Sequence, residues 1–143
     1  MRIWRTVVAA ASLAGLGIAL YLTSVHFGAA PLACATAGAV NCEAVLTSRY
    51  ATWFGIPTSA FGAAWFLAVL LIALRSEKPS WLLRILSWLG ALTVVFLVYL
   101  ELFQIGAICL WCSILHLLIL TILVAVEWAA ASGEEEVPLS PGG

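Results

Sequence analysis

Long apolar runs separated by short polar segments dominate the chain. Four runs have about the length that a helix needs to cross a bilayer, and these are Ile3–Phe27, Thr58–Leu74, Trp81–Phe103 and Ile108–Ala130. The connections are residues 28–57, 75–80 and 104–107, of which only the first is long. This pattern predicts an all-α membrane protein with four transmembrane helices and one large loop between the first two.

Composition agrees with this prediction, because 64% of the residues are apolar and only 9% are charged, whereas soluble domains carry about 25% charged residues. We expect one membrane domain over residues 1–131 and a disordered acidic tail over 132–143. Arg2 and Arg5, followed by a long apolar stretch, also fit a signal peptide. That run exceeds the 7–15 apolar residues of a signal core, so we expect a retained helix. The net charge of −1 gives no reason to expect a nucleic-acid partner.

The basic residues predict the orientation in the membrane. Five of the six fall on one side of the predicted helices, and these are Arg2, Arg5, Arg75, Lys78 and Arg84. Only Arg49 lies in the long loop. Basic residues favour the cytoplasmic side, so we expect both termini in the cytoplasm and all four cysteines outside. In a bacterial inner membrane, that outer side is the oxidising compartment where disulfides persist.

The four cysteines form two pairs that are candidates for redox chemistry. Cys109 and Cys112 are separated by two residues at the start of the fourth apolar run, where a helix N-terminus favours a thiolate. Cys34 and Cys42 lie in the long loop with seven residues between them. The loop pair alone also fits a structural disulfide. Two pairs at one membrane boundary allow thiol–disulfide exchange between them.

Metal centres fit the cysteines less well, so we predict no metal. Structural zinc sites use two closely spaced pairs of thiolates, but seven residues separate Cys34 from Cys42. The expected oxidising compartment also disfavours four reduced thiolates. Covalent haem attachment requires Cys-x-x-Cys-His, and Ser113 follows Cys112 here.

Two ionisable residues lie inside the apolar runs. His116 follows Cys112 by four residues and Cys109 by seven, which places all three on one helix face. His116 either bonds a neighbouring helix or hydrogen-bonds a quinone oxygen and moves a proton. Glu101 near the outer end of the third run is either a proton relay or a carboxylate that extends to the interface, and we favour the second interpretation.

Aromatic and small residues cluster near the predicted outer surface. Tyr50, Trp53 and Phe54 fit an interfacial aromatic belt or the cap of a flat apolar cofactor. Phe61 and Trp65 share one face of the second helix. Small residues that could mark close helix contacts are Gly15, Gly17, Gly62 and Gly90.

Several motifs together resemble the vitamin K epoxide reductase family, above all its bacterial members. They are Cys34, the segment Asn41-Cys42-Glu43-Ala44-Val45-Leu46-Thr47-Ser48, Phe54-Gly55-Ile56-Pro57 and Gly106-Ala107-Ile108-Cys109-Leu110-Trp111-Cys112. The resemblance extends over about residues 5–130. It implies a four-helix bundle around a quinone pocket on the outer side.

The resemblance also implies a role for each cysteine. Cys112 would face the quinone and Cys109 would exchange with the loop. Cys42 would be the inner shuttle thiol, and Cys34 would face a protein partner. Many bacterial relatives carry a fused thioredoxin-like domain that this sequence lacks, which implies a separate thioredoxin-like partner.

The implied cofactor is a quinone of the menaquinone, ubiquinone or vitamin K type. Ser48 matches a serine beside the active cysteines, while His116 and Thr58 stand where vertebrate relatives carry tyrosine and asparagine. Those two differences weigh against vitamin K epoxide chemistry but not against quinone reduction. The predicted quinone contacts are Ser48, Tyr50, Phe54, Thr58, Phe61, Trp65 and His116.

The sequence therefore predicts a membrane oxidase that takes electrons from the thioredoxin-like partner through Cys34/Cys42 and Cys109/Cys112 to a membrane quinone. One alternative keeps the fold and reduces vitamin K epoxide or quinone in an endoplasmic reticulum. Another is a non-catalytic four-span structural protein with a stapled loop, for which Cys112→Ala would change nothing.

Overall fold

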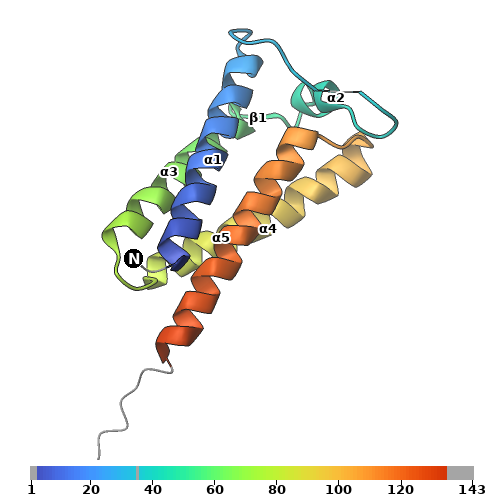
Figure 1. Cartoon of the computed structure of the whole chain (residues 1–143). Coiled ribbons are helices and arrows are strands. Elements are labelled where there is room, and N and C mark those ends of the chain that lie inside the picture. Colours follow the sequence, from blue (N-terminus) through green and yellow to red (C-terminus); the bar gives the residue numbers. More distant parts are fainter. Residues whose placement is uncertain (1–2, 35, 135–143) are drawn as a thin grey trace, which may run out of the picture.

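The protein is an all-α membrane protein with four long helices. A computed structural model (Figure 1) describes residues 3–34 and 36–134. The long helices are α1 (Ile3–His26), α3 (Thr58–Arg75), α4 (Trp81–Tyr99) with its continuation η1 (Leu100–Ile105), and α5 (Leu110–Glu134). Each is long and apolar enough to cross a membrane. The first three residues of the predicted tail are helical, because α5 continues to Glu134, and the rest of that prediction lies in residues 135–143, outside the described part.

The helices pack around one apolar core. α1 contacts α3 and α5 most extensively, and α4 packs mainly on α5 (Figure 1). The largest fully buried apolar side chains are Phe66, Leu22, Leu83, Ile122, Val8, Val69 and Val126. Apolar side chains also cover the outside of the bundle, where Leu92, Val95 and Val124 are more than half exposed. Apolar surfaces on both sides of each helix are what a bilayer environment requires.

Two of the four glycines predicted at close contacts occupy such positions. Gly15 lies against the ring of Phe66, and a Cβ on Gly90 would lie 2.6 Å from the ring of Trp65. The other two, Gly17 of α1 and Gly62 of α3, have open space where a Cβ would point. These contacts let α1 approach α3 and let the Trp65 ring approach the backbone of α4.

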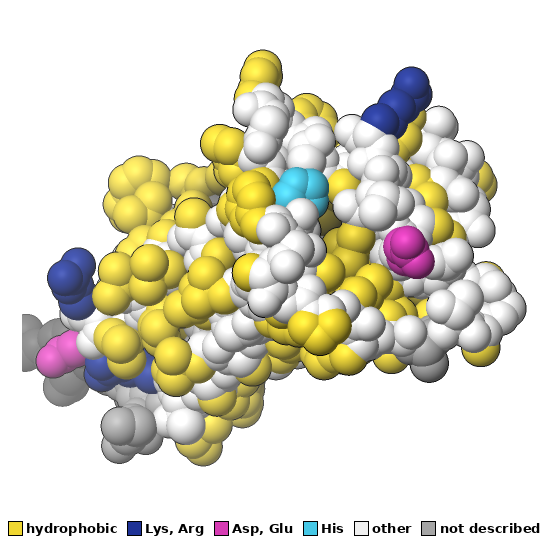
Figure 2. Space-filling model, turned by 90° about the horizontal axis from the view of Figure 1, so that it is seen from above, with side chains coloured by type: hydrophobic (Ala, Val, Ile, Leu, Met, Phe, Trp, Pro, Cys, Tyr) yellow, Lys and Arg dark blue, Asp and Glu magenta, His cyan; other side chains and the backbone are white. Residues whose placement is uncertain are grey.

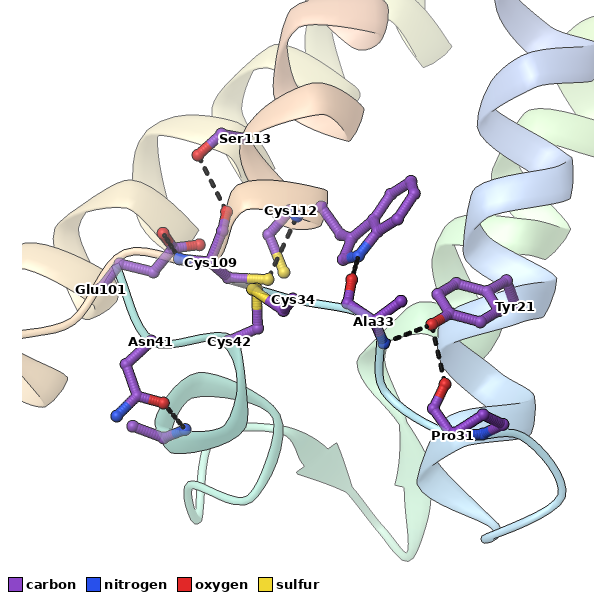
Figure 3. Close-up of a disulfide and its surroundings, with 12 residues drawn as sticks. Tyr21, Pro31, Ala33, Cys34, Asn41, Cys42, Glu101, Cys109, Cys112 and Ser113 are labelled. Atoms are coloured by element: carbon purple, nitrogen blue, oxygen red, sulfur yellow. Dashed lines mark hydrogen bonds between the residues drawn. A yellow bond between two sulfur atoms is a disulfide. The ribbon is translucent and has the colours of Figure 1, made fainter. Parts of the chain in front are cut away.

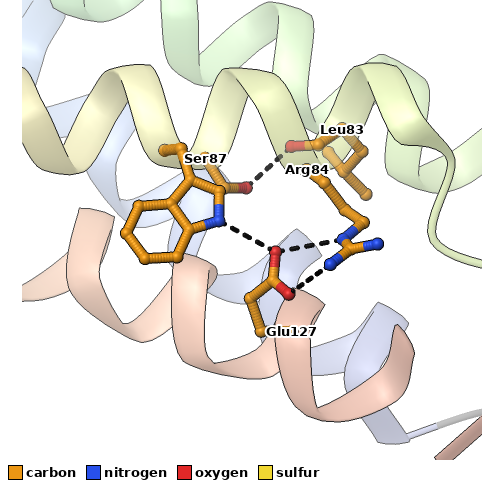
Figure 4. A network of polar contacts seen from close by, with 5 residues as sticks. Leu83, Arg84, Ser87 and Glu127 are labelled. Carbon is orange, nitrogen blue, oxygen red and sulfur yellow. Dashed lines mark hydrogen bonds and ion pairs between the residues drawn. The ribbon is translucent and has the colours of Figure 1, made fainter. Parts of the chain in front are cut away.

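Polar contacts fasten the end of the bundle that carries the N-terminus. The guanidinium of Arg84 in α4 donates to both carboxylate oxygens of Glu127 in α5, at 3.1 and 2.8 Å (Figure 4). The indole of Trp88 donates to the same carboxylate at 3.1 Å. Arg5 donates to the carbonyl of Ala73 at 3.3 Å, which caps the last turn of α3.

A short helix and a hairpin cover the opposite end of the bundle. They are α2 (Cys42–Leu46) and the antiparallel pair β1 (Thr52–Trp53) and β2 (Ile56–Pro57). The turn residues Phe54 and Gly55 have φ of 53° and 80°. Positive φ at both central positions is the signature of a type I′ hairpin turn, and Gly55 adopts it without strain.

Candidate redox site

The structure brings all four cysteines together at the end of the bundle covered by α2. Cys34 and Cys42 form a disulfide with their Cα atoms 6.2 Å apart, whereas Cys109 and Cys112 are free thiols. The four residues belong to one apolar cluster, and Figure 3 shows the two thiols beside the disulfide. Cys42 and Cys109 are fully buried, and Cys34 and Cys112 are partly exposed. The two couples are therefore neighbours, each with one inner and one outer sulfur.

Backbone pairing between the loop and the chain before α5 holds the couples in register. Ile108 donates to the carbonyl of Ala39 at 2.9 Å, and Asn41 donates to the carbonyl of Ile108 at 3.0 Å. The side chain of Asn41 caps α2. Because Cys42 follows Asn41 and Cys109 follows Ile108, this short parallel bridge places the two inner sulfurs side by side.

A second clamp fixes the backbone at Cys34. The Tyr21 hydroxyl accepts from the amide of Ala33 and donates to the carbonyl of Pro31, both at 2.9 Å. The Trp111 indole donates to the carbonyl of Ala33 at 2.8 Å. The Tyr21 and Trp111 rings pack edge to face, 5.4 Å apart (Figure 3). Trp111 lies between the two thiols in sequence, so it links the second couple to the first.

Cys109 caps α5 rather than lying on its face. The helix begins at Leu110, and the Cys109 carbonyl accepts from the amide of Ser113 at 2.9 Å. The Cys109 sulfur accepts from the amide of Cys112 at 3.2 Å. The predicted single face therefore holds for Cys112 and His116 but is wrong for Cys109. A hydrogen bond from the Cys112 thiol lowers the pKa of Cys109, against an opposing effect of burial, so Cys109 is the sulfur that ionises first.

Glu101 lies directly behind Cys109. Its carboxyl oxygen accepts from the amide of Cys109 at 3.3 Å, and the side chain is only 6% exposed. The Glu101 carbonyl accepts from the amides of Gly106 and Ala107, which ends the π-helical segment η1. Gly106 adopts a left-handed φ of 70° there. The prediction that Glu101 extends to the interface is wrong, because position 101 continues the buried face of α4.

A cavity of about 300 Å³ lies next to these thiols. Mainly apolar side chains of α1, α3, α4, η1 and α5 form its walls, and the loop closes one end. Figure 2 looks onto that end, where apolar side chains and few charged ones surround a hollow. Six of the predicted quinone contacts line the cavity together with Cys112 and Glu101, and these are Ser48, Tyr50, Thr58, Phe61, Trp65 and His116.

Phe54 is the predicted contact that the structure keeps apart from the others. Its side chain is 98% exposed at the tip of the hairpin, and it is not among the residues around the cavity. A hairpin turn directs its central side chains away from the strands, so Phe54 points off the molecule. The assignment to quinone binding is therefore not supported for Phe54.

Polar groups make up little of the cavity surface, and the buried imidazole of His116 is one of them. His116 is buried, and no residue within 3–34 or 36–134 hydrogen-bonds to its imidazole. The hydroxyls of Ser48 and Thr58 donate to loop carbonyls, and the Tyr50 hydroxyl accepts from Arg49 at 2.6 Å. An apolar space with a few polar groups, bordered by a thiol, fits a flat ring with carbonyl oxygens.

Several lining residues were missed in the sequence. They include His26, Leu89, Thr93, Leu97 and Ile119. No residue of α4 was predicted to line a cavity, because an apolar helix shows no sequence signal for the face that it turns to one.

Comparison with models of known protein families matches residues 6–126 to the Vitamin K epoxide reductase family. The chain belongs to this family. The match includes all four cysteines and every residue of the cavity, so the resemblance seen in the motifs is confirmed. Membership makes the chain an oxidoreductase of the membrane, in a family whose general chemistry joins thiols and disulfides to quinones.

Proposed function

We propose that this member of the vitamin K epoxide reductase family is a thiol oxidase. It takes two electrons from a separate thioredoxin-like protein outside the cytoplasm and passes them to a membrane quinone. The observation that carries the proposal is the arrangement of the couples: the Cys34–Cys42 disulfide lies against the Cys109 and Cys112 thiols, and Cys112 borders the apolar cavity.

Electrons enter at Cys34, the more exposed sulfur of the loop disulfide. A thiolate of the partner attacks this sulfur, and Cys42 leaves as a thiolate. The second thiol of the partner then resolves the mixed disulfide, which yields an oxidised partner and two reduced loop cysteines.

Exchange then moves the electrons inward. The Cys42 thiolate attacks Cys109 of a Cys109–Cys112 disulfide and releases the Cys112 thiolate. Attack by Cys34 on Cys42 re-forms the loop disulfide and frees Cys109. The oxidised loop couple and the two free thiols at Cys109 and Cys112 support this order, because they match the state expected after the exchange.

The second couple discharges into the cavity. A bound quinone accepts two electrons and two protons. Cys109, with its lowered pKa, closes onto Cys112 to form the new disulfide. The unpartnered imidazole of His116 offers a hydrogen bond to a carbonyl oxygen in the cavity, and it stays a proposed contact like Ser48, Tyr50, Thr58, Phe61 and Trp65.

The proposed orientation places the cysteines outside the cytoplasm. Arg5, Arg75, Lys78 and Arg84 all lie toward the end of the bundle away from α2. This asymmetry supports an extracytoplasmic redox end by the tendency of basic residues to stay inside.

Reconstitution of the full chain in lipid nanodiscs tests the proposal. The assay supplies a reduced thioredoxin-like protein with soluble menaquinone or ubiquinone analogues, and measures partner thiols and quinol. We expect one quinol per partner disulfide, and total loss of both products in Cys34→Ala and Cys112→Ala. Thr121→Ala, on the exposed side of α5, serves as a control with unchanged activity.

Other outcomes would overturn the proposal. Consumption of vitamin K epoxide in place of a quinone would identify the reductase instead. A folded wild-type protein that oxidises no thiol with either analogue would favour the non-catalytic structural role.

A further inference from the structure

The oxidase mechanism leaves one buried acid unused. Glu101 is 6% exposed, and among the described residues the one hydrogen bond to its carboxyl group comes from the Cys109 amide at 3.3 Å. Within the described residues, the ion pair of Arg84 with Glu127 is at the other end of the bundle, and no cation contacts Glu101. An acid held in an apolar membrane region without a cation is expensive to keep ionised, and such residues are candidates for function.

Glu101 and Cys109 cannot both be charged at low cost. A carboxylate at Glu101 acts against the thiolate form of Cys109, because like charges repel strongly in a medium of low polarity. The pair therefore holds one negative charge. Either Glu101 is ionised and Cys109 is a thiol, or Cys109 is a thiolate and Glu101 carries the proton.

The position of Glu101 also connects the thiols to the cavity. Glu101 lines the cavity along with Cys112 and His116. Its carboxyl group contacts Cys109 on the side away from Cys112 (Figure 3). The carboxyl group is thus next to both the sulfur that ionises first and the space for the acceptor.

We propose that Glu101 is a proton relay that holds the proton released by Cys109 and delivers it to the quinone in the cavity. This inference rests on the proposed oxidase function. It explains why an acid is buried at the end of α4, where the sequence favoured a surface position.

The relay balances the reaction. In the reduced couple Cys112 is a thiol and Cys109 is a thiolate, because the Cys109 proton rests on Glu101. The two sulfurs then form a bond and release two electrons to the quinone, which takes one proton from Cys112 and one from Glu101. The products are the Cys109–Cys112 disulfide and the quinol, and Glu101 returns to its ionised form.

Glu101→Gln is the decisive variant, because glutamine keeps the size and the oxygen that accepts from the Cys109 amide but cannot carry the proton. Single-turnover reduction of a quinone analogue by the pre-reduced protein should slow by at least about 100-fold, the lower range of general acid–base effects. Glu101→Asp should recover part of the loss. A Glu101→Gln variant that reduces quinone at the wild-type rate would overturn the relay.

A second measurement needs no quinone. Infrared difference spectra of the Cys34→Ser/Cys42→Ser protein, recorded between the reduced and oxidised states of the Cys109–Cys112 couple, report on carboxyl protonation. We expect a carboxylic acid C=O band that grows on reduction and is absent after Glu101→Gln. A band that is insensitive to the redox state, or that persists in the Gln variant, would refute the relay.

The two measurements separate this inference from the proposed function. If the wild-type protein reduces no quinone, the oxidase proposal fails while the infrared spectra still report on Glu101. If Glu101→Gln does not fold, Glu101→Asp and the wild-type infrared spectra decide the question.

Discussion

At the scale of single residues, the chemistry depends on which sulfur becomes a thiolate. The Cys112 thiol donates to Cys109 and lowers the pKa of Cys109, so Cys109 is the stronger nucleophile near neutral pH. Cys109 is fully buried, which keeps soluble thiols away from it and supports the neighbouring Cys42 as its proposed exchange partner.

Two substitutions at Cys112 test this hydrogen bond. Serine keeps a hydroxyl donor to Cys109, whereas alanine removes it. A lowered pKa means that the thiolate is present at lower pH, so loss of the donor must move its appearance to higher pH. We expect the ultraviolet absorbance of the Cys109 thiolate to titrate at higher pH in Cys112→Ala than in Cys112→Ser. Identical titrations would assign the shift to another cause.

Gly90 controls the shape of the cavity through Trp65. A Cβ at position 90 would lie 2.6 Å from Cζ2 of Trp65 and 3.0 Å from Ile119, so Gly90→Ala must push the indole into the space for the quinone. We expect a higher KM for quinone analogues and a stability loss of about 1–3 kcal/mol. Partner oxidation under excess quinone measures the first effect and thermal unfolding the second.

Gly17→Ala is the matched control for that substitution. Nothing lies within 4 Å of a Cβ at position 17, and alanine is the better helix former by about 1 kcal/mol. This variant should be at least as stable as the wild type with an unchanged KM. An equal rise in KM for both variants would show that the Trp65 contact does not shape the site.

At the scale of the elements, two connections position the redox couples. The bridge between residues 39–41 and Ile108 aligns Cys42 with Cys109. The Trp111 indole ties the start of α5 to the backbone beside Cys34. The loop is therefore attached to the fourth helix at both of its cysteines, an arrangement that would favour the proposed intramolecular exchange between the couples.

Trp111→Phe tests the second connection. Phenylalanine keeps an aromatic ring against Tyr21 but loses the bond to the Ala33 carbonyl. We expect slower exchange between the couples, by about 5- to 10-fold for a net hydrogen bond of roughly 1–1.5 kcal/mol. Acid quenching and mass spectrometry of the alkylated thiols follow which couple is oxidised. Trp88→Phe, which removes an indole bond at the other end, should leave the exchange rate unchanged, and equal effects would contradict the clamp.

The elements differ in how well the sequence predicts them. Apolar runs of bilayer length predicted all four membrane helices, because a spanning helix must satisfy its backbone internally and face lipid. Glu101 was misplaced for the same reason: in a helix that is apolar all round, hydropathy does not distinguish a buried face from one that meets lipid. The hairpin over Thr52–Pro57 was not predicted, because its strands are too short to show alternation.

The site was partly predictable for a different reason. Cysteine spacing and the family motifs identified the sulfurs, and Ser48, Tyr50 and Thr58 were found through neighbouring motifs. Phe54 belongs to the motif Phe54-Gly55-Ile56-Pro57 but points outward, since the left-handed turn reverses the chain there. The cavity wall from α4 depends on packing between distant segments, and a single sequence carries no signal for it.

At the scale of the whole molecule, the two ends are chemically different. One end carries the disulfide, the thiols and the cavity mouth, and Arg49 is its basic residue among those described. The other end carries Arg5, Arg75 and Lys78 with the polar contacts of Arg84. This separation supports the orientation that we propose, in which electrons pass from the aqueous surface at Cys34 to the membrane at Cys112.

Site-specific labelling tests the orientation that this asymmetry implies. In a background with the native cysteines replaced by serine, Thr36→Cys places a reporter in the exposed loop and Glu77→Cys places one in the α3–α4 link. A maleimide that cannot cross membranes should label position 36 in intact bacterial cells, and position 77 only after permeabilisation. Reversed labelling would put the couples in the reducing cytoplasm, where a thiol oxidase of this design would work against the glutathione pool. Labelling of both positions from outside would mean that α3, the long helix between them, does not cross the membrane. The four-span topology itself would then be wrong.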